Sequence, residues 1–409
     1  MSIINPFRAF RPAPELVADV ATHSVERYSK DEIKHILSTN PISFLQVIHP
    51  IEIASQSPED RLQSIKKRYK ESISAHTFLQ DPAPCYYIYR QVKNGRHHTG
   101  IIGLASVEDY NNNIIKIHEQ TLAEREEKLK EYLDVCEFNA EPVCLTYPHN
   151  KGLNDLMHLK IKEVPLYDYI KDGIQHSVWI IDQQNDIERI HSLFNNIPAI
   201  YIADGHHRAA SSARLAKMRM DANPNHNGSE AYNFFTAALF ADDELTIYGY
   251  HRLVQSLNGL SADLFLEKLK NRFIVTYLDH LTEAVAKKIV YLYIDSKWYG
   301  VHIASIEHST GDIVHSLDVS VLSDYILSPI LGIENIRNDK RISFSPGIKS
   351  MAEIEKMVDS GKAAAAFCLS PVSFEELIAV ADSGKEMPPK STWIEPKLES
   401  GLLIYSLEK

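Results

Sequence analysis

The spacing of hydrophobic residues along the chain predicts both strands and helices. Aromatic and β-branched residues are concentrated at 85–90 and 99–107, and the Asn-Gly pair at 94–95 is a strong signal for a tight hairpin turn. Short apolar runs at 177–181 and 197–203 are typical of strands that are buried in a sheet. The sequence therefore predicts an antiparallel hairpin, followed later in the chain by buried strands.

Helical periodicity appears in several segments of the first half. Ser29 is the expected N-cap of one helix, because Glu32 occupies the capping-box position. Ser57, followed by a proline, predicts the start of a second helix with one apolar face. A charged helix is predicted at 122–133, and a helix of small residues is predicted at 206–220.

The second half of the chain contains a further mixture of elements. The predicted strands are 233–240, 289–294, 363–369 and 402–406, and the predicted helices are 261–273 and 319–331. A chain of 409 residues is too long for one hydrophobic core, because domains usually contain about 100–200 residues. We expect an α+β fold with an N-terminal region at 1–113, a core region at 114–240 and a C-terminal region at 241–409.

The clearest candidate site is the segment 204–208, Asp-Gly-His-His-Arg, between a buried strand and the small-residue helix. Gly205 permits an abrupt turn and the close approach of a ligand, because glycine has no side chain. The first amide groups of a helix lack partners within the helix, and the helix dipole is positive at that end. Arg208 adds a planar set of donors suited to phosphate. The segment therefore predicts an anion site, with a nucleotide phosphate as the expected ligand.

Other interpretations of this segment are less favoured. Adjacent histidines on a helix project about 100° apart, so His206 and His207 are not expected to share a zinc ion. His97 and His98 in the predicted hairpin are interpreted as a solvent-exposed polar stretch, and no metal is assigned there. The structural alternative for 204–208 is an aspartate that merely caps the helix beside polar surface histidines. Four functional side chains within five residues favour the binding site instead.

Composition and charge narrow the class of protein. A formal net charge of −11 disfavours nucleic acid as a partner, because that binding needs clustered Lys and Arg. The widely spaced cysteines indicate neither a zinc site nor a disulfide framework and are expected to be reduced, buried thiols; they are Cys85, Cys136, Cys144 and Cys368. The N-terminus lacks a signal-peptide pattern, and no apolar stretch approaches membrane-spanning length. We expect a cytoplasmic protein that does not associate with membranes.

Two resemblances follow from these motifs. The turn at 204–208, preceded by Lys-Ile-His-Glu at 116–119, is similar to the ParB/sulfiredoxin-like superfamily, in which a His-Glu segment and a Gly-x-(His/Arg)-Arg turn flank a nucleotide. The chain as a whole resembles domain-of-unknown-function family 1015; the shared motifs are Asn-Pro-Phe-Arg at 5–8, Asn-Pro-Ile-Ser-Phe-Leu at 40–45, the turn at 204–208, Leu-Asp-Val at 317–319 and Met-Pro-Pro-Lys-Ser-Thr at 387–392. The resemblance implies a ParB/sulfiredoxin-like α/β core embedded between the N-terminal and C-terminal α+β regions.

The resemblance also implies a reaction. The relatives of the core include free serine kinases, which phosphorylate the hydroxyl of L-serine from a nucleotide. By this likeness Glu119 is the general base, with Asp204 and His207 as the other catalytic residues. The residues implied to bind phosphate or nucleotide are Gly205, His206, Arg208, Lys116 and His118. The implied cofactors are ATP or ADP and Mg²⁺, with Asp204 as the expected metal ligand, and the implied acceptor is serine or a similar small metabolite.

The chain departs from its relatives in ways that limit the function. Sulfiredoxins have a cysteine directly after the glycine, where this chain has His206, so repair of oxidised cysteine lacks its nucleophile. ParB proteins carry a Gly-Glu-Arg-Arg turn and a helix-turn-helix, and neither is found here. Further candidate site residues lie in a polar loop, where Lys390, Ser391 and Thr392 offer one cation and two hydroxyls, although such a stretch is often a simple turn.

Two functions therefore stay open. The first is a phosphotransferase acting on free serine or a similar hydroxylated metabolite. The second is a non-catalytic nucleotide-binding or sensing protein, since Glu119 lies in a charged stretch where carboxylates commonly face solvent. A nuclease is a more distant alternative. Neither the donor nucleotide nor the acceptor nor the oligomeric state follows from the sequence.

Overall fold

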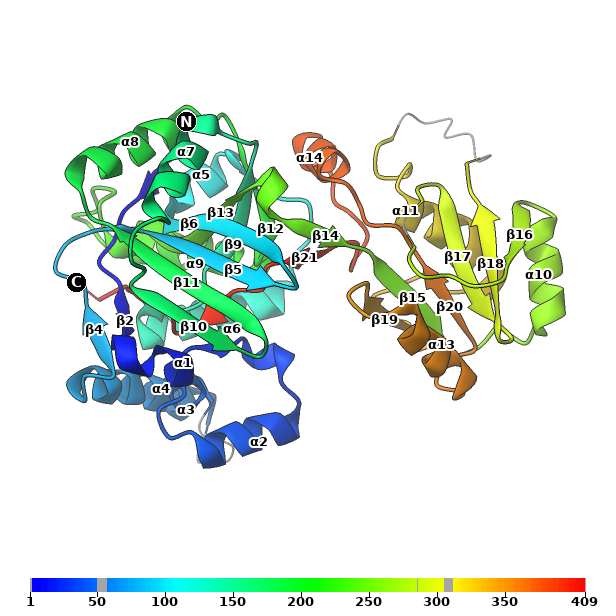
Figure 1. Cartoon of the computed structure of the whole chain (residues 1–409), viewed down its shortest axis with the longest axis horizontal. Helices are drawn as coiled ribbons and strands as arrows, with labels where there is room; N and C mark the ends of the chain where they lie inside the picture. The colour runs from blue at the N-terminus through cyan, green and yellow to red at the C-terminus, as the bar shows by residue number, and fades with distance from the viewer. Residues whose placement is uncertain (1, 50–56, 285, 305–311, 409) are drawn as a thin grey trace. The chain divides into compact units, whose positions relative to one another are not determined.

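A computed structural model describes residues 2–49, 57–284, 286–304 and 312–408 of the chain (Figure 1). The described residues form two compact units. The first contains Met1–Ile117, Thr121–Leu245 and Pro396–Lys409, and the second contains His118–Gln120 and Thr246–Glu395. This division differs from the three regions expected, because the hairpin of the expected N-terminal region and the strand before the 204–208 turn belong to one sheet.

The first unit is built on a nine-stranded mixed sheet. Its strand order is β10-β11-β5-β6-β13-β9-β12-β7, and β1 pairs additionally with β6. Parallel pairs join β12 to β7 and β13 to β9, whereas the other pairs are antiparallel. The strands are β1 Ile4–Asn5, β5 Tyr86–Lys93, β6 Arg96–Ser106, β7 Ile115–Lys116, β9 Val143–Tyr147, β10 Tyr167–Lys171, β11 Ile174–Ile181, β12 Ile200–Asp204 and β13 Phe234–Ala241.

The predicted hairpin is confirmed as β5 and β6. Lys93 pairs with Arg96 across a two-residue loop. Asn94 has a φ angle of 51° and Gly95 one of 78°, as this type of tight turn requires. One detail of the prediction is wrong: His97 is exposed, but His98 is buried, and its Nδ1 lies 2.7 Å from the carbonyl oxygen of Glu244. The sheet continues beyond the hairpin, so this side chain is covered.

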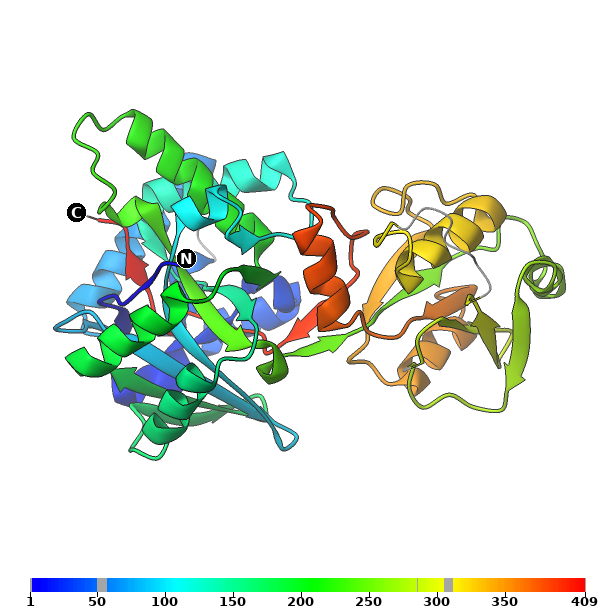
Figure 2. The ribbon, with the colours of Figure 1, turned by 90° about the horizontal axis from the view of Figure 1, so that it is seen from above.

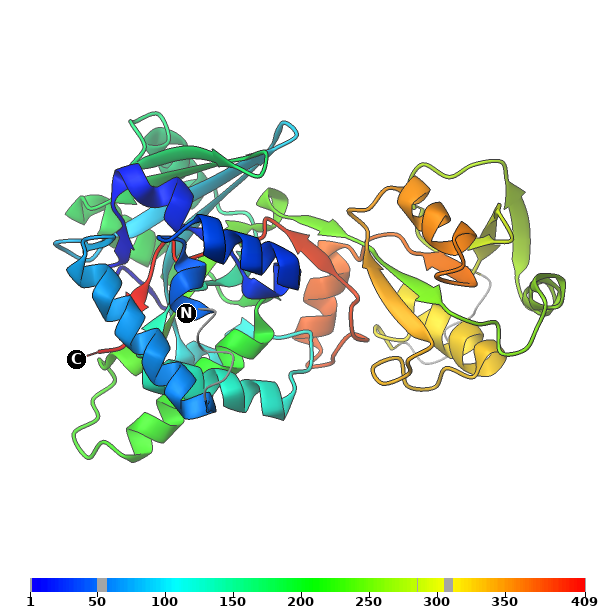
Figure 3. The same ribbon diagram turned by 90° about the horizontal axis from the view of Figure 1, so that it is seen from below.

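Helices surround the sheet of the first unit. They are α1 Val17–Val20, α2 Lys30–Thr39, α3 Phe44–Ile48, α4 Pro58–Ser74, α5 Val107–Asn111, α6 Ala123–Cys136, α7 Lys151–Lys160, α8 Gln184–Asn195 and α9 His206–Asp221. The predicted capping box of Ser29 and Glu32 is present at α2, and Ser57 caps α4. Helices α1–α4 lie at the bottom of this unit in Figure 1 and face the viewer in Figure 3.

Three short pairs of strands and several 3₁₀ turns complete the first unit. The short pairs are β2 Phe10–Pro12 with β4 Phe78–Gln80, β3 Thr22–His23 with β22 Glu399–Ser400, and β8 Phe138–Asn139 with β23 Tyr405–Ser406. The 3₁₀ turns are η1 Pro14–Leu16, η2 Val25–Arg27, η4 Ala231–Asn233 and η5 Asp242–Glu244. The predicted final strand, 402–406, is shorter than expected: its last two residues form β23, and Ile404 makes a single bridge to Phe10 of β2.

The core of the first unit lies between the sheet and the helices α7, α8 and α9. Ile200 and Ile202 of β12 are buried in it together with Ala209 and Ala216 of α9. Figure 2 views the unit from the side on which α7 and α8 lie. Because β12 is enclosed by the sheet and α9 is packed against it, the junction between these two elements is held in place by the core.

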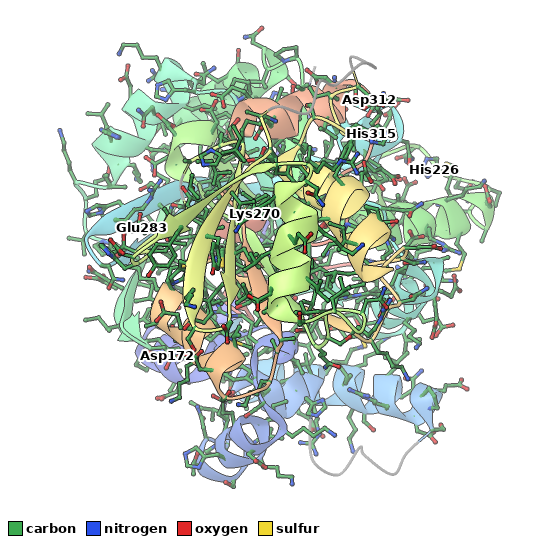
Figure 4. The ribbon with its side chains drawn as sticks, turned by 90° about the vertical axis from the view of Figure 1, so that its right-hand side faces the viewer. Asp172, His226, Lys270, Glu283, Asp312 and His315 are labelled. Carbon is green, nitrogen blue, oxygen red and sulfur yellow. The ribbon has the colours of Figure 1, made fainter. Side chains whose placement is uncertain are left out.

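The second unit contains a six-stranded antiparallel sheet with the order β16-β18-β17-β20-β15-β19 and a two-stranded pair, β14 with β21. The strands are β14 Thr246–Tyr248, β15 Tyr250–Val254, β16 Ile274–Leu278, β17 Ile289–Ile294, β18 Lys297–His302, β19 Ile342–Pro346, β20 Ala365–Cys368 and β21 Trp393–Glu395. The helices are α10 Ala262–Lys270, α11 Asp318–Leu322, η6 Ser323–Leu327, α12 Ser328–Leu331, α13 Met351–Asp359 and α14 Phe374–Asp382. Figure 4 shows this unit with α10 in front and Lys270 labelled at the end of that helix.

Two further predictions can be compared with the structure. The apolar helix predicted at 319–331 is confirmed as a helix at 318–331, although its middle turn at 323–327, between α11 and α12, is π-helical. The cysteines are free and buried, as expected. None of the described helices combines the length and the apolar character that crossing a membrane requires.

Candidate functional site

The turn at 204–208 joins β12 to α9 through Gly205. This residue has a φ angle of 98° and a ψ angle of 27°, a left-handed conformation that glycine adopts readily. A Cβ atom at this position would lie 2.8 Å from Nε of Arg208 and 2.9 Å from its Nη2. The backbone conformation therefore favours glycine here, and an added Cβ would also displace the guanidinium of Arg208.

Helix α9 begins directly after this turn and is pressed against the sheet. Its inward side carries small residues, including Ala209, Ser211 and Ser212, which are buried. The amide groups of Arg208 and Ala209 both donate to the carbonyl oxygen of Gly205. Small side chains let the helix approach the sheet closely, so the start of the helix is rigidly placed.

Two cations and two carboxylates form a chain of ion pairs at the start of α9. Lys397 Nζ lies 3.1 Å from Oδ2 of Asp204, and Nη2 of Arg208 lies 3.8 Å from the same oxygen. Nη1 of Arg208 lies 3.2 Å from Oε2 of Glu141, whose Oε1 accepts a hydrogen bond of 2.6 Å from Ser400. The charges alternate along the chain, so each cation is stabilised by a carboxylate.

The carboxylate of Asp204 is held in its ionised form. Desolvation of the carboxylate raises its pKa, but the positive charges of Lys397 and Arg208 lower it by more, so the pKa falls to about 2. The side chain is 44% exposed, whereas that of Lys397 is 17% exposed. An ionised, partly exposed carboxylate beside two cations therefore marks the accessible end of the turn.

The two histidines of the turn have different surroundings. His206 is buried, and burial lowers its pKa to about 4, so its imidazole is neutral at neutral pH. Nε2 of His207 accepts a hydrogen bond of 3.0 Å from the amide of Leu122. A neutral His207 consequently carries its proton on Nδ1, where it is a hydrogen-bond donor.

The segment 116–119 contains the other candidates that the resemblance implied. Lys116 lies on β7 and pairs in register with Tyr201 of β12, which is the strand that leads to the turn. His118 is buried, and its carbonyl oxygen accepts a hydrogen bond of 2.8 Å from the amide of Met387. Glu119 is half-buried and, like His118, belongs to the second unit.

The chain anchors Glu119 on both sides. Lys116 is fixed by its strand pairing, and the amide of Leu122 is fixed by its hydrogen bond to His207. In sequence, Glu119 lies three residues from each of these anchors. Both anchors contact β12 or α9, the elements that form the turn.

The loop at 390–392 belongs to the second unit. Lys390 has a φ angle of 57°, and its Nζ lies 5.7 Å from the centre of the Tyr250 ring. Ser391 is buried and donates a hydrogen bond of 2.6 Å to the carbonyl oxygen of Pro388, whereas Thr392 is half-buried. The hydroxyl of Ser391 thus already closes the turn.

Sequence reasoning missed Lys397 and Glu141 at the turn. Both are single charged residues without a local motif, and they are far from Asp204 in sequence. No local sequence pattern of the kind found at 204–208 marks either residue. Their role becomes visible when the sheet brings them to the start of α9.

The donor set at the turn suits only one kind of metal site. Within the described parts of the chain there is no group of three or more His, Cys, Asp or Glu residues that could hold a metal ion. Magnesium, however, is commonly bound by one or two carboxylates together with substrate phosphates. Asp204 fits that arrangement because its carboxylate is ionised and partly exposed.

The chain has a clear family match. The family model described as "Protein of unknown function (DUF1015)" matches residues 4–320. No curated protein matches the chain in sequence. The family match includes the hairpin, the segment 116–119 and the turn at 204–208, but it ends before the loop at 390–392 and before Lys397.

Several solved structures show a distant likeness. A free serine kinase variant in complex with AMP is 14% identical, with 72% of this chain and 87% of that chain covered and a TM-score of 0.37. A free serine kinase variant in complex with ADP is 13% identical, with the same coverages and TM-score. A conserved hypothetical protein from Pyrococcus furiosus is 13% identical, with 74% and 94% covered and a TM-score of 0.35. At these values the function has to be argued from the residues of the chain itself.

Proposed function

We propose, on the premise that the chain belongs to the DUF1015 family of proteins of unknown function, that it moves a nucleotide phosphate to the hydroxyl of free serine or a similar small metabolite. The observation that carries this proposal is the junction of β12 and α9. There, Gly205 exposes a helix start beside the guanidinium of Arg208. A helix start with an adjacent arginine favours a phosphate group over an uncharged ligand.

The phosphate is held by hydrogen-bond donors that the fold positions before the ligand binds. Arg208 is a permanent cation, and its guanidinium is oriented by Glu141. The Nδ1 proton of His207 and the amides at the start of α9 supply further donors. Such fixed donors stabilise the charge of a transferring phosphoryl group without needing to reorganise during the reaction.

Glu119 is assigned as the general base. In the proposed step the carboxylate accepts the proton of the acceptor hydroxyl, and the hydroxyl oxygen forms a bond to the terminal phosphorus of the nucleotide. The bond between that phosphorus and the bridging oxygen breaks, and the shortened nucleotide leaves with the electron pair. The sequence position supports this assignment, because Glu119 lies between Lys116, which pairs with β12, and Leu122, whose amide donates to His207 of α9.

The other candidates have supporting roles in this proposal. Lys116 and His118 orient the segment that carries the base, since one pairs with β12 and the other is buried. Lys390, Ser391 and Thr392 are given no role in this step, since the hydroxyl of Ser391 already donates within its own turn. A magnesium ion held by Asp204 and the nucleotide would neutralise phosphate charge.

The proposal is tested by incubating the full chain with ATP or ADP, Mg²⁺ and a panel of hydroxylated metabolites that includes L-serine, and by following phosphorylated products by ³¹P NMR. We expect Glu119→Gln to lower the rate by about 100-fold or more, because general-base catalysis contributes about 10²–10⁴-fold. Glu124→Gln is the matched control, since this glutamate is exposed on α6 and paired with Lys128. Equal rates for the two variants would remove Glu119 as the base.

The alternative is a nucleotide-binding or sensing protein that transfers no phosphate. It would be favoured if the chain binds nucleotide, loses that binding in Arg208→Ala and forms no product with any acceptor. Absence of both binding and turnover would contradict the transferase and the sensor alike.

A further inference from the structure

Lys397 reaches the start of α9 from the last segment of the chain. Its Nζ and the Nη2 of Arg208 converge on one oxygen, Oδ2 of Asp204, at 3.1 Å and 3.8 Å respectively. Two cations directed at one carboxylate oxygen form the kind of arrangement that also binds a phosphate oxygen. The geometry therefore places a second phosphate-binding cation opposite the arginine of the turn.

The backbone around Lys397 is fixed by buried partners in the first unit. The side-chain amide of Gln91, a buried residue of β5, donates a hydrogen bond of 2.8 Å to the carbonyl oxygen of Lys397. The same amide nitrogen lies 2.7 Å from the hydroxyl of Tyr89. Two residues further on, Glu399 pairs with His23 between β22 and β3. Lys397 can therefore leave Asp204 only by rotation of its own side chain.

The charge balance at the turn determines what an incoming anion has to displace. Lys397 and Arg208 supply two positive charges, and Asp204 and Glu141 supply two negative charges. Glu141 is also held by Ser400, whereas Asp204 is the more exposed of the two carboxylates, with 44% of its side chain accessible against 30%. Asp204 is thus the internal anion that competes with a ligand for the two cations.

We propose that Lys397 is a phosphate-binding residue of the nucleotide site and that Asp204 occupies, in the absence of ligand, the place of a phosphate oxygen between Lys397 and Arg208. This inference rests on the proposed function, and it adds a residue from outside the 204–208 turn to that site. On binding, the Lys397 ammonium passes from the carboxylate to the phosphate. The carboxylate of Asp204 is then released from Lys397 and pairs with a cation that accompanies the nucleotide.

The first arm of the test measures the affinity of the full chain for ADP and for ATP by calorimetry, in EDTA and in Mg²⁺. We expect Lys397→Met to weaken nucleotide binding by about tenfold or more, because a charge-assisted hydrogen bond to phosphate is lost. Lys397→Arg keeps the charge and should retain most of the affinity. Lys217→Met is the matched control, since this lysine of α9 is exposed and paired with Asp221 at 3.0 Å.

The second arm tests competition by Asp204. Asp204→Asn should bind nucleotide more tightly than the wild type in EDTA, by about threefold or more, because the internal anion is gone. A purely structural role of the Asp204–Lys397 pair predicts equal or weaker binding for this variant. Combining Asp204→Asn with Lys397→Met should reduce the gain, because one of the two competed cations is absent.

The outcomes separate the inference from the function on which it rests. A wild type that binds neither ADP nor ATP contradicts the proposed nucleotide site, and the inference fails with it. Normal binding by the wild type and by Lys397→Met overturns the role of Lys397 alone. If Lys397→Met does not fold, Lys397→Arg and Asp204→Asn still decide the matter, and no gain for Asp204→Asn in EDTA overturns the competition.

Discussion

The buried side chain of Glu399 makes the stability of the folded chain depend on pH. Its side chain is buried, and the hydroxyl of Tyr169 donates a hydrogen bond to Oε2. Oε1 has no hydrogen-bond partner among the residues that the structure describes. Burial is the largest cause of the raised pKa of this carboxyl group. The folded chain therefore favours the neutral form of Glu399.

The sign of the effect follows from linkage. Because the folded-state pKa lies above the ordinary value of about 4.3, the stabilising contribution is complete below that pH and is lost as the pH rises through the folded-state pKa. We expect Glu399→Gln, which stays neutral, to have about the same melting temperature as the wild type near pH 4. As the pH rises through the folded-state pKa, the variant should come to melt at a higher temperature than the wild type, because only the wild-type side chain gains a buried charge.

Melting curves at several pH values measure this difference directly. Glu131→Gln is a suitable control, because Glu131 is exposed on α6 and its replacement changes the charge in the same way. A difference between Glu399→Gln and the wild type that is the same at every pH would contradict the explanation by burial.

At the residue scale, the positions that could be predicted from the sequence are those whose signal is local. The turn at 204–208 was predicted because its glycine, histidines and arginine are adjacent, and local backbone chemistry is sufficient to interpret them. Lys397 and Glu141 were not predicted, because a single charged residue carries no signal until its partner is known. His98 was expected to be exposed and is buried, since its environment depends on residues of η5 that are distant in sequence.

At the scale of elements, the junction of β12 and α9 is the feature that the proposed function depends on. Gly205 there and Gly173, between β10 and β11, both have positive φ angles, of 98° and 75°. An added Cβ at position 173 would meet nothing within 4 Å, whereas one at position 205 would meet the guanidinium of Arg208. The two glycines therefore separate backbone strain from displacement of the arginine.

We expect Gly205→Ala and Gly173→Ala to lower the free energy of unfolding by a similar amount, about 1–2 kcal/mol each, because a left-handed backbone disfavours a side chain. Only Gly205→Ala should also weaken nucleotide binding, by about tenfold or more, since the added Cβ displaces the guanidinium of Arg208, which is a hydrogen-bond donor to phosphate in the proposed site. Denaturant unfolding and calorimetry with ADP measure the two effects. Equal nucleotide affinity of the two variants would contradict the displacement of Arg208 from the proposed site.

Elements with strong local signals were predicted well. The hairpin of β5 and β6 follows from its turn residues, and the capping box at α2 follows from Ser29 and Glu32. The π-helical turn at 323–327 was not predicted, because an apolar run does not distinguish an α-helical turn from a π-helical one. The two-residue strand β7 was also beyond prediction, since it is defined only by its pairing with β12.

At the scale of the whole molecule, the chain crosses between two compact units more than once. The second unit is inserted between Leu245 and Pro396, and the short segment His118–Gln120 also belongs to it. Each unit has its own buried core: Phe235 of β13 is buried in the first, and Phe367 of β20 is buried in the second. Separate cores are the physical basis for separate unfolding.

Scanning calorimetry of the full chain should therefore show two thermal transitions. Phe235→Ala should lower one transition and Phe367→Ala the other, each on the order of 10 °C, because truncating a buried phenylalanine costs about 3–5 kcal/mol. Each variant is the control for the other, since both side chains are fully buried on sheet strands. A single transition lowered by both variants would mean that the two units unfold together.

The sequence by itself determined the features that arise from neighbouring residues. These are the mixed strand and helix content, the hairpin, the helix caps and the abrupt strand-to-helix turn at 204–208. Each depends on backbone conformation and side-chain chemistry within a few residues, and the local sequence alone specifies both.

Only the tertiary structure decided which distant residues surround that turn. It joined the expected N-terminal and core regions in one sheet, and it brought Lys397 and Glu141 to the charges of Asp204 and Arg208. The physical reason is that ion pairs and strand pairing depend on distance in space, and a single sequence does not record which of its many charges and strands become neighbours when the cores pack.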